Sequence, residues 1–164
     1  MRSWPLRLIP KLKRIILFLV TGLGAGYFPW FPGTAGTLVG IPLSLALNRI
    51  ASVSLALALL TLAAFAVTAI WLAQKGEEIF HQKDSPRIVI DEIAGFLLAG
   101  FLCAAEFAPN AAAFILFRFF DIIKLFPAGR AEEISGGVGV VMDDLIAGLY
   151  TFVIIRILLY AEFL

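Results

Sequence analysis

Five acidic residues stand in or beside strongly apolar segments of this chain, and they are the first feature that could do chemistry. They are Asp91, Glu92, Asp121, Asp143 and Asp144. Ionisable groups at membrane depth or at its edge are costly, so their presence indicates a functional site. Four of the five form adjacent pairs, whose charges repel unless a cation is shared. Mg²⁺ bound by a few carboxylates and a phosphate would supply that charge. We therefore expect all five to be catalytic residues and metal ligands for phosphate chemistry at a membrane.

The acidic pairs also have a structural interpretation. Asp91-Glu92 and Asp143-Asp144 are each expected to open an apolar helix, where an acidic residue can cap the free amides and complement the dipole. One acid per helix would satisfy that role. Capping therefore leaves the second acid of each pair unexplained.

Basic residues near the acids are candidate phosphate ligands. Arg118, Asp121 and Lys124 are spaced i, i+3 and i+6, which places them roughly along one face of a helix. Arg118 and Lys124 could hold phosphate oxygens, Arg118 as a planar fork and Lys124 as a point charge. The alternative is an intrahelical ion pair, which contributes only about 0.2–0.5 kcal/mol when it is exposed.

A glycine-rich loop at 33–37 leads into a helix and could present backbone amides to an anion. Its candidate phosphate-binding residues are Thr34, Gly36 and Thr37. The alternative is close helix packing through small residues, with Gly36 and Gly40 forming a Gly-x-x-x-Gly pattern. His81, the single histidine, and Cys103, the single cysteine, are expected to be a solvated residue and a buried inert thiol.

The composition is that of a membrane protein. The 164 residues are 61% hydrophobic and 15% charged, whereas soluble domains have about 25% charged residues. A net charge of +1 gives no indication of a nucleic-acid partner. The basic residues before the apolar run 15–20 could belong to a signal peptide, but we expect a basic segment held at the anionic cytoplasmic leaflet and followed by a short helix. The length fits one domain, 1–164.

The acids can share one site only if the chain crosses the membrane an even number of times between them. We expect a hairpin of helices 36–47 and 51–73 that turns at Asn48-Arg49, and a second hairpin of 93–107 and 110–125 that turns at Pro109-Asn110. At 1.5 Å per residue, 36–47 covers only about 18 Å, too short to cross, whereas 51–73 and 145–164 are long enough.

This arrangement also predicts the orientation of the protein in the membrane. Of the 13 lysines and arginines, all but Arg49 and Arg156 fall on the side of the acids. Because basic residues concentrate on the cytoplasmic side, the acids are expected to be cytoplasmic. We therefore predict an all-α, small polytopic membrane bundle with short helical hairpins and an active site at its cytoplasmic face.

Four segments, in order, resemble the phosphatidylglycerophosphatase A family. They are Pro32-Gly33-Thr34-Ala35-Gly36-Thr37-Leu38, Ile88-Val89-Ile90-Asp91-Glu92-Ile93-Ala94-Gly95, Phe117-Arg118-Phe119-Phe120-Asp121-Ile122-Ile123-Lys124 and the run from Gly136 through Asp143-Asp144 to Gly148. The family tends to have Lys-Pro-x-Pro-Ile where this chain has Lys124-Leu125-Phe126-Pro127-Ala128, so the end of that helix departs from the pattern.

The resemblance implies an Mg²⁺-dependent enzyme of the bacterial inner membrane that hydrolyses phosphatidylglycerophosphate to phosphatidylglycerol. Direct attack by water is favoured, because the chain has no Cys-x₅-Arg or Asp-x-Asp nucleophile motif. The number of metal ions, the general base and the oligomeric state stay open. Two other hypotheses are a lipid-headgroup phosphotransferase, whose Asp-Gly-x₂-Ala-Arg pattern is absent, and a cation transporter, which would place its acids within the spans.

Overall fold

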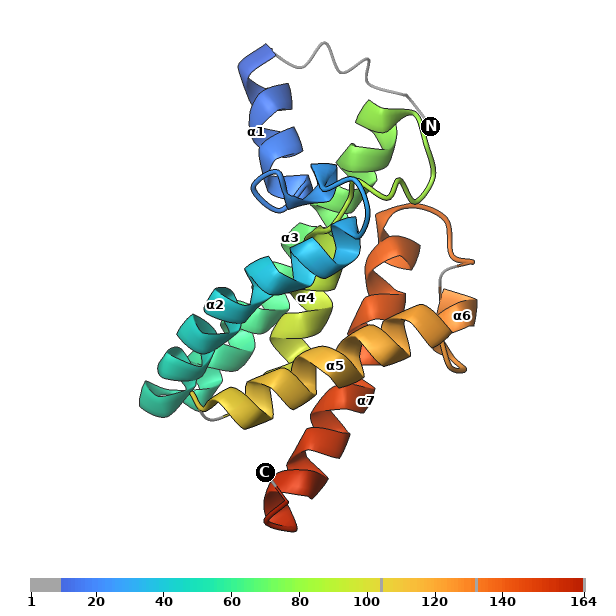
Figure 1. Cartoon of the computed structure of the whole chain (residues 1–164). Coiled ribbons are helices and arrows are strands. Elements are labelled where there is room, and N and C mark those ends of the chain that lie inside the picture. The colour runs from blue at the N-terminus through green and yellow to red at the C-terminus, as the bar shows by residue number, and fades with distance from the viewer. Residues whose placement is uncertain (1–9, 104, 132, 164) are drawn as a thin grey trace.

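The computed structural model describes residues 10–103, 105–131 and 133–163, and these residues form helices and no strand (Figure 1). The basic residues that precede position 10 lie outside this description. Within the described ranges, seven α-helices and a short 3-10 turn follow one another: α1 (Pro10–Val20), η1 (Ala25–Tyr27), α2 (Pro32–Val53), α3 (Leu55–Phe80), α4 (Ile90–Ala99), α5 (Phe107–Ile123), α6 (Ala128–Ala131) and α7 (Gly137–Tyr160).

The first hairpin exists, but its first helix is longer than predicted. α2 has 22 residues, begins with Pro32 at a position that tolerates a missing N–H, and continues through Pro42. It is therefore long and apolar enough to cross a membrane, unlike the predicted helix 36–47. The predicted turn at Asn48-Arg49 is wrong as well. The chain turns at Ser54, whose hydroxyl oxygen accepts a hydrogen bond from the amide of Leu57 at 3.3 Å and caps α3.

The second hairpin also exists, with its turn earlier than predicted. α4 ends at Ala99, and the loop that follows leads to α5, which starts at Phe107. Pro109 lies in the first turn of α5, where the missing amide has no helical partner to lose, so the predicted break at Pro109-Asn110 is wrong. Asn48 fixes the loop: its side-chain amide donates to the Gly100 carbonyl at 2.8 Å and accepts from the Leu102 amide at 2.8 Å.

α7 begins at Gly137, earlier than the predicted start at 145. The Gly137 amide donates to the side-chain oxygen of Gln74 at 2.9 Å, and a Cβ at Gly137 would collide with the Ile70 carbonyl of α3. The helix therefore starts where its backbone packs directly on α3. Asp143 and Asp144 consequently lie in its second turn, and the prediction that they open a helix is wrong.

The bundle is built around α4. This helix contacts α2, α3, α5 and α7, and most of its residues are buried. In the part of the chain that the structure describes, three helices, α2, α3 and α7, are long and apolar enough to span a membrane. The α2–α3 turn and the C-terminal end of α7 lie at one end of the molecule, at the bottom of Figure 1, and α1 lies at the other. The prediction of an all-α membrane bundle with helical hairpins is confirmed.

Candidate active site

Two glycines bring α4 and α7 into backbone contact. A Cβ at Gly95 would lie 2.6 Å from the Asp144 carbonyl oxygen, and a Cβ at Gly148 would collide with the Gly95 carbonyl. Asp91 precedes Gly95 by four residues, and Asp144 precedes Gly148 by four residues. Since residues four apart share a helix face, both acids lie one turn above the closest approach of the helices. The crossing therefore directs the two carboxylates at each other.

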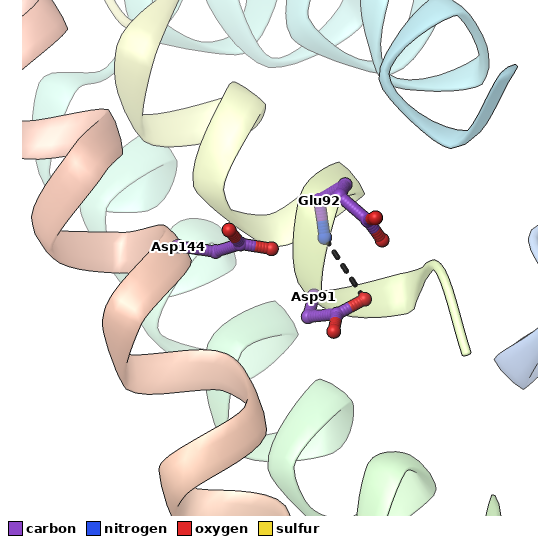
Figure 2. A group of neighbouring side chains, drawn as sticks. All are labelled: Asp91, Glu92 and Asp144. Atoms are coloured by element: carbon purple, nitrogen blue, oxygen red, sulfur yellow. Dashed lines mark hydrogen bonds between the residues drawn. The ribbon is translucent and has the colours of Figure 1, made fainter. Parts of the chain in front are cut away.

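Asp91, Glu92 and Asp144 form the candidate metal-binding group. One oxygen from each carboxylate can be chosen so that all three atoms lie within 4.8 Å of one another. Figure 2 shows Asp144 reaching from α7 toward the first turn of α4, where the Glu92 amide donates to Asp91 Oδ1 at 3.1 Å. Asp91 and Asp144 are only 6% and 3% exposed. Glu92 Oε2 is buried without a hydrogen-bond partner among the described residues.

The surroundings of the acid cluster disfavour ionisation of all three carboxyl groups at once. Burial raises the pKa of Asp91 well above its ordinary value, and the charge of Glu92 raises it further. Burial likewise raises the pKa of Glu92 to about 7; its hydrogen bond with Asp91 lowers that pKa, and the charge of Asp121 raises it. These carboxylates can all be ionised at neutral pH if a cation lies among them. The cluster has the oxygen ligands that Mg²⁺ prefers.

Arg118 and Asp121 lie beside this group. The Arg118 guanidinium forms an ion pair with Asp121 at 2.6 Å, so the predicted i, i+3 ion pair is present. Arg118 Nε is buried without a hydrogen-bond partner in the described structure. The guanidinium therefore retains an unused donor at the acid cluster.

Lys124 does not continue the helix face of Arg118 and Asp121. It ends α5 in a left-handed conformation with φ of 51°. Its ammonium group contacts Asp143 of α7 at 2.9 Å. Asp143 is thus held by a lysine, while the neighbouring Asp144 faces Asp91 and Glu92.

The glycine-rich segment 33–37 is the start of α2 rather than a loop. A Cβ at Gly33 would collide with the Glu92 carboxylate and lie 3.1 Å from both terminal nitrogens of Arg118. The Thr37 hydroxyl donates to the Gly33 carbonyl at 2.9 Å and lies 3.5 Å from Arg118 Nη1. The start of α2 is therefore directly adjacent to the acid cluster.

Thr34 and Gly36 have different surroundings. Thr34 is half-buried in the first turn of α2, where amides point out of the helix without helical partners. Gly36 packs against α4, because a Cβ there would lie 2.6 Å from the Val89 Cβ. Gly36 therefore allows close helix packing, which was the alternative interpretation of the glycine-rich segment. Sequence reasoning did not identify Gly33 or Gly95 as site residues, although both stand in the motif segments.

The positions of the single histidine and the single cysteine match the expected solvation and burial. His81 is exposed at the end of α3. Cys103 is a buried free thiol in the α4–α5 loop, away from the acids.

The sequence is similar to known membrane phosphatases. The sequence profile of the family described as phosphatidylglycerophosphatase A matches residues 18–159. A Haemophilus influenzae protein named phosphatidylglycerophosphatase A is 34% identical over 158 residues, covering 95% of each chain. The protein of the same name from Escherichia coli is 29% identical over 135 residues, covering 80% of this chain and 76% of its own.

A Bacteroides thetaiotaomicron protein with the provisional name phosphatidylinositol-3-phosphatase is 40% identical over 144 residues, covering 84% of this chain and 89% of its own. No solved structure matches the chain significantly. The profile match extends over the glycine-rich start of α2, the acid cluster and Arg118. The chain therefore belongs to the phosphatidylglycerophosphatase A family and is a membrane phosphatase.

Proposed function

We propose that the chain removes the phosphate of phosphatidylglycerophosphate, in the inner membrane of a bacterium, with Mg²⁺ held by Asp91, Glu92 and Asp144. The observation that carries this proposal is the convergence of three carboxylates, two buried and that of Glu92 partly buried, beside an arginine with an unused donor. Ionised carboxylates that lie this close together and away from water are strongly disfavoured, and a cation among them would let all three ionise near neutral pH. The unpartnered Glu92 Oε2 offers an oxygen to it.

The chain's own groups divide the remaining work. Mg²⁺ would neutralise phosphate charge and make water a better nucleophile near neutral pH. Arg118 would hold phosphate oxygens through its unused Nε–H and its terminal nitrogens, and Asp121 keeps the guanidinium in place. The free amides at the start of α2, with the Thr34 hydroxyl, would add neutral donors. Thr37 would act differently from its predicted role, because its hydroxyl already donates to the Gly33 carbonyl and can only help to position Arg118. Lys124 would balance the charge of Asp143 and approach the phosphate from α5.

The choice of lipid rests on the names of the relatives. The family and two of the three relatives are named for phosphatidylglycerophosphate. The most identical of these three is named for a phosphatidylinositol 3-phosphate activity. Both lipids carry a phosphomonoester on the headgroup. A second candidate function is therefore hydrolysis of phosphatidylinositol 3-phosphate at the same site.

One assay tests the reaction, the metal and the substrate together. Purified protein in detergent should release inorganic phosphate from phosphatidylglycerophosphate with Mg²⁺ and not with EDTA. Phosphatidylinositol 3-phosphate should be a poorer substrate. Release that is insensitive to EDTA would contradict the metal proposal. Faster release from the inositol lipid would favour the second candidate.

The proposed cytoplasmic position of the site rests on the distribution of basic residues. Lys11, Lys13 and Arg14 are exposed on α1, and Arg87 is exposed just before α4. Lys83→Cys and Glu133→Cys, each made in a Cys103→Ala background, should be protected from an impermeant maleimide in intact cells. Ser52→Cys, at the opposite end of the bundle, should react. Labelling of Lys83→Cys from outside would reverse the orientation.

A further inference from the structure

An apolar groove runs between α2 and α5 and starts next to the candidate phosphate ligands. Its volume is about 400 Å³, within the range of small-molecule sites. The residues that line it are Leu38, Ile41, Phe107, Ala111, Phe114 and Ile115, together with Asn110. The Asn110 side chain donates to the Glu106 carbonyl at 2.7 Å, so its amide nitrogen is used within its own helix. We name this surface the α2–α5 groove.

The groove is continuous with the site in sequence and in space. Leu38 follows Thr37, and Phe114 lies one helical turn before Arg118, so the same two helices present the phosphate ligands and the groove wall. Phe96 of α4 packs against one of the residues that line the groove. Its ring packs edge-on against Phe114, with centroids 6.3 Å apart, and a Cβ at Gly40 would lie 3.1 Å from it.

The groove is open to the membrane rather than filled by protein. Leu38, Phe107 and Ile115 remain exposed by 53%, 89% and 66%. About 16 Å of helix separates Phe107 from Arg118 at 1.5 Å per residue. That length is close to half of a hydrocarbon core of roughly 30 Å, the thickness that one acyl chain fills. The path from Arg118 to the far end of the groove thus has the length of one lipid chain, and the groove along it is apolar.

We propose that one acyl chain of the phospholipid substrate lies in the α2–α5 groove while its phosphate is held at Arg118. This inference rests on the proposed function and specifies which part of the lipid the enzyme recognises. The bilayer already solvates an acyl chain, so the chain gains little from burial alone. Binding of the acyl chain instead orients the phosphate to which it is tethered, because the protein then holds the headgroup and the chain at a fixed separation. The enzyme should accordingly discriminate between long and short chains.

Filling the groove should harm long-chain substrates selectively. Ala111→Trp should lower kcat/KM by about 10-fold or more for dioleoyl phosphatidylglycerophosphate and leave the dihexanoyl lipid unchanged. Ala46→Trp is the matched control, because Ala46 lines a second apolar groove between α2, α3 and α4. It should leave both substrates unchanged. An equal effect of Ala111→Trp on both chain lengths, or no effect on either, would overturn the proposal.

Photo-cross-linking of the wild-type protein tests the same inference without a substitution or turnover. The probe is phosphatidylglycerophosphate with a diazirine in the middle of one acyl chain. Its cross-links should map to 38–41 and 107–115, and unlabelled substrate should displace it better than phosphatidylcholine does. Cross-links concentrated at 43–65, or equal competition by phosphatidylcholine, would overturn the groove assignment. Failure of wild-type phosphate release would instead contradict the proposed function, and the cross-link map would still be informative.

Discussion

Asp143 and Asp144 are neighbours in sequence, but the structure gives them different partners. Asp144 joins Asp91 and Glu92, whereas Asp143 pairs with Lys124. We predict that Asp144→Asn reduces phosphate release by at least about 100-fold, because removing a metal ligand should exceed the 10–100-fold effect of losing an outer-shell partner. Asp143→Asn should reduce it by about 10-fold. Rates measured across a range of Mg²⁺ concentrations would check both values.

The two asparagine variants serve as controls for each other. Neither acid caps α7, so the fold should survive both changes, and circular dichroism should be unchanged. Raising Mg²⁺, or replacing it with Mn²⁺, should partly rescue Asp144→Asn and have little effect on Asp143→Asn. Equal loss in the two variants with no rescue would contradict the assignment of Asp144 as a ligand.

Arg118 offers a second prediction at the scale of single residues. Arg118→Ala should lower kcat/KM by about 10- to 100-fold, because it removes charge-assisted hydrogen bonds worth roughly 1.5–3 kcal/mol. Arg118→Lys should recover only part of this loss, since an ammonium lacks the planar fork. The Mg²⁺ concentration for half-maximal activity should not change. The matched control is Arg130→Ala, an exposed arginine over the Phe126 ring. If Arg118→Ala had wild-type kinetics, the only role left for Arg118 would be its ion pair with Asp121.

Among the elements, the α4–α7 crossing determines whether the acids meet. Gly95→Ala places a methyl group 2.6 Å from the Asp144 carbonyl and 2.7 Å from the Phe117 ring. The helices must then separate, and overpacking of this kind destabilises a protein by roughly 1–3 kcal/mol. We predict a lower melting temperature in detergent and a loss of activity larger than the stability change explains. Gly129→Ala, where the nearest atom lies at 3.3 Å, should change neither.

The elements also show which predictions depend on tertiary partners. The three acids that converge are among the five that the sequence singles out, because charges in apolar segments are costly. The turn at Asn48-Arg49 could not be excluded from sequence, because Asn48 binds backbone groups more than 50 residues away. The break predicted at Pro109 is wrong for a local reason, since a proline is harmless in the first turn of a helix. The pairing of Asp144 with Asp91 follows from the two glycines four residues later, and that helical spacing was available in the sequence.

At the scale of the whole molecule, the acid cluster lies beside the start of the buried central helix α4, and apolar helices surround it. α4 contacts four other helices, so the cluster is shielded from solvent on several sides. Burial of ionised carboxylates destabilises the metal-free protein, because the charges lose hydration and repel one another. A bound cation relieves the repulsion. The stability of the molecule should consequently depend on pH and on Mg²⁺ together.

The final prediction concerns this linkage. Burial raises the pKa of Glu92 from 4.5 to about 7 and raises that of Asp91 as well. Between about pH 4.5 and pH 7 the folded state binds more protons than the unfolded state, so the free energy of unfolding decreases as pH rises. In EDTA, the melting temperature in detergent should therefore fall from pH 5 to pH 8. Mg²⁺ should raise it more at pH 8 than at pH 5, because only ionised carboxylates bind the cation.

Glu92→Gln separates the contribution of Glu92 to this pH dependence from the contributions of other titrating groups. The variant lacks a carboxyl whose pKa rises on folding, so its melting temperature in EDTA should fall less steeply between pH 5 and pH 8 than that of the wild type. Glu78→Gln, on the exposed side of α3, is the matched control and should keep the wild-type slope. A wild-type melting temperature that is constant or rises over this range in EDTA would show that the cluster is solvated in the apo protein, and a cation would then not be needed to hold its carboxylates together.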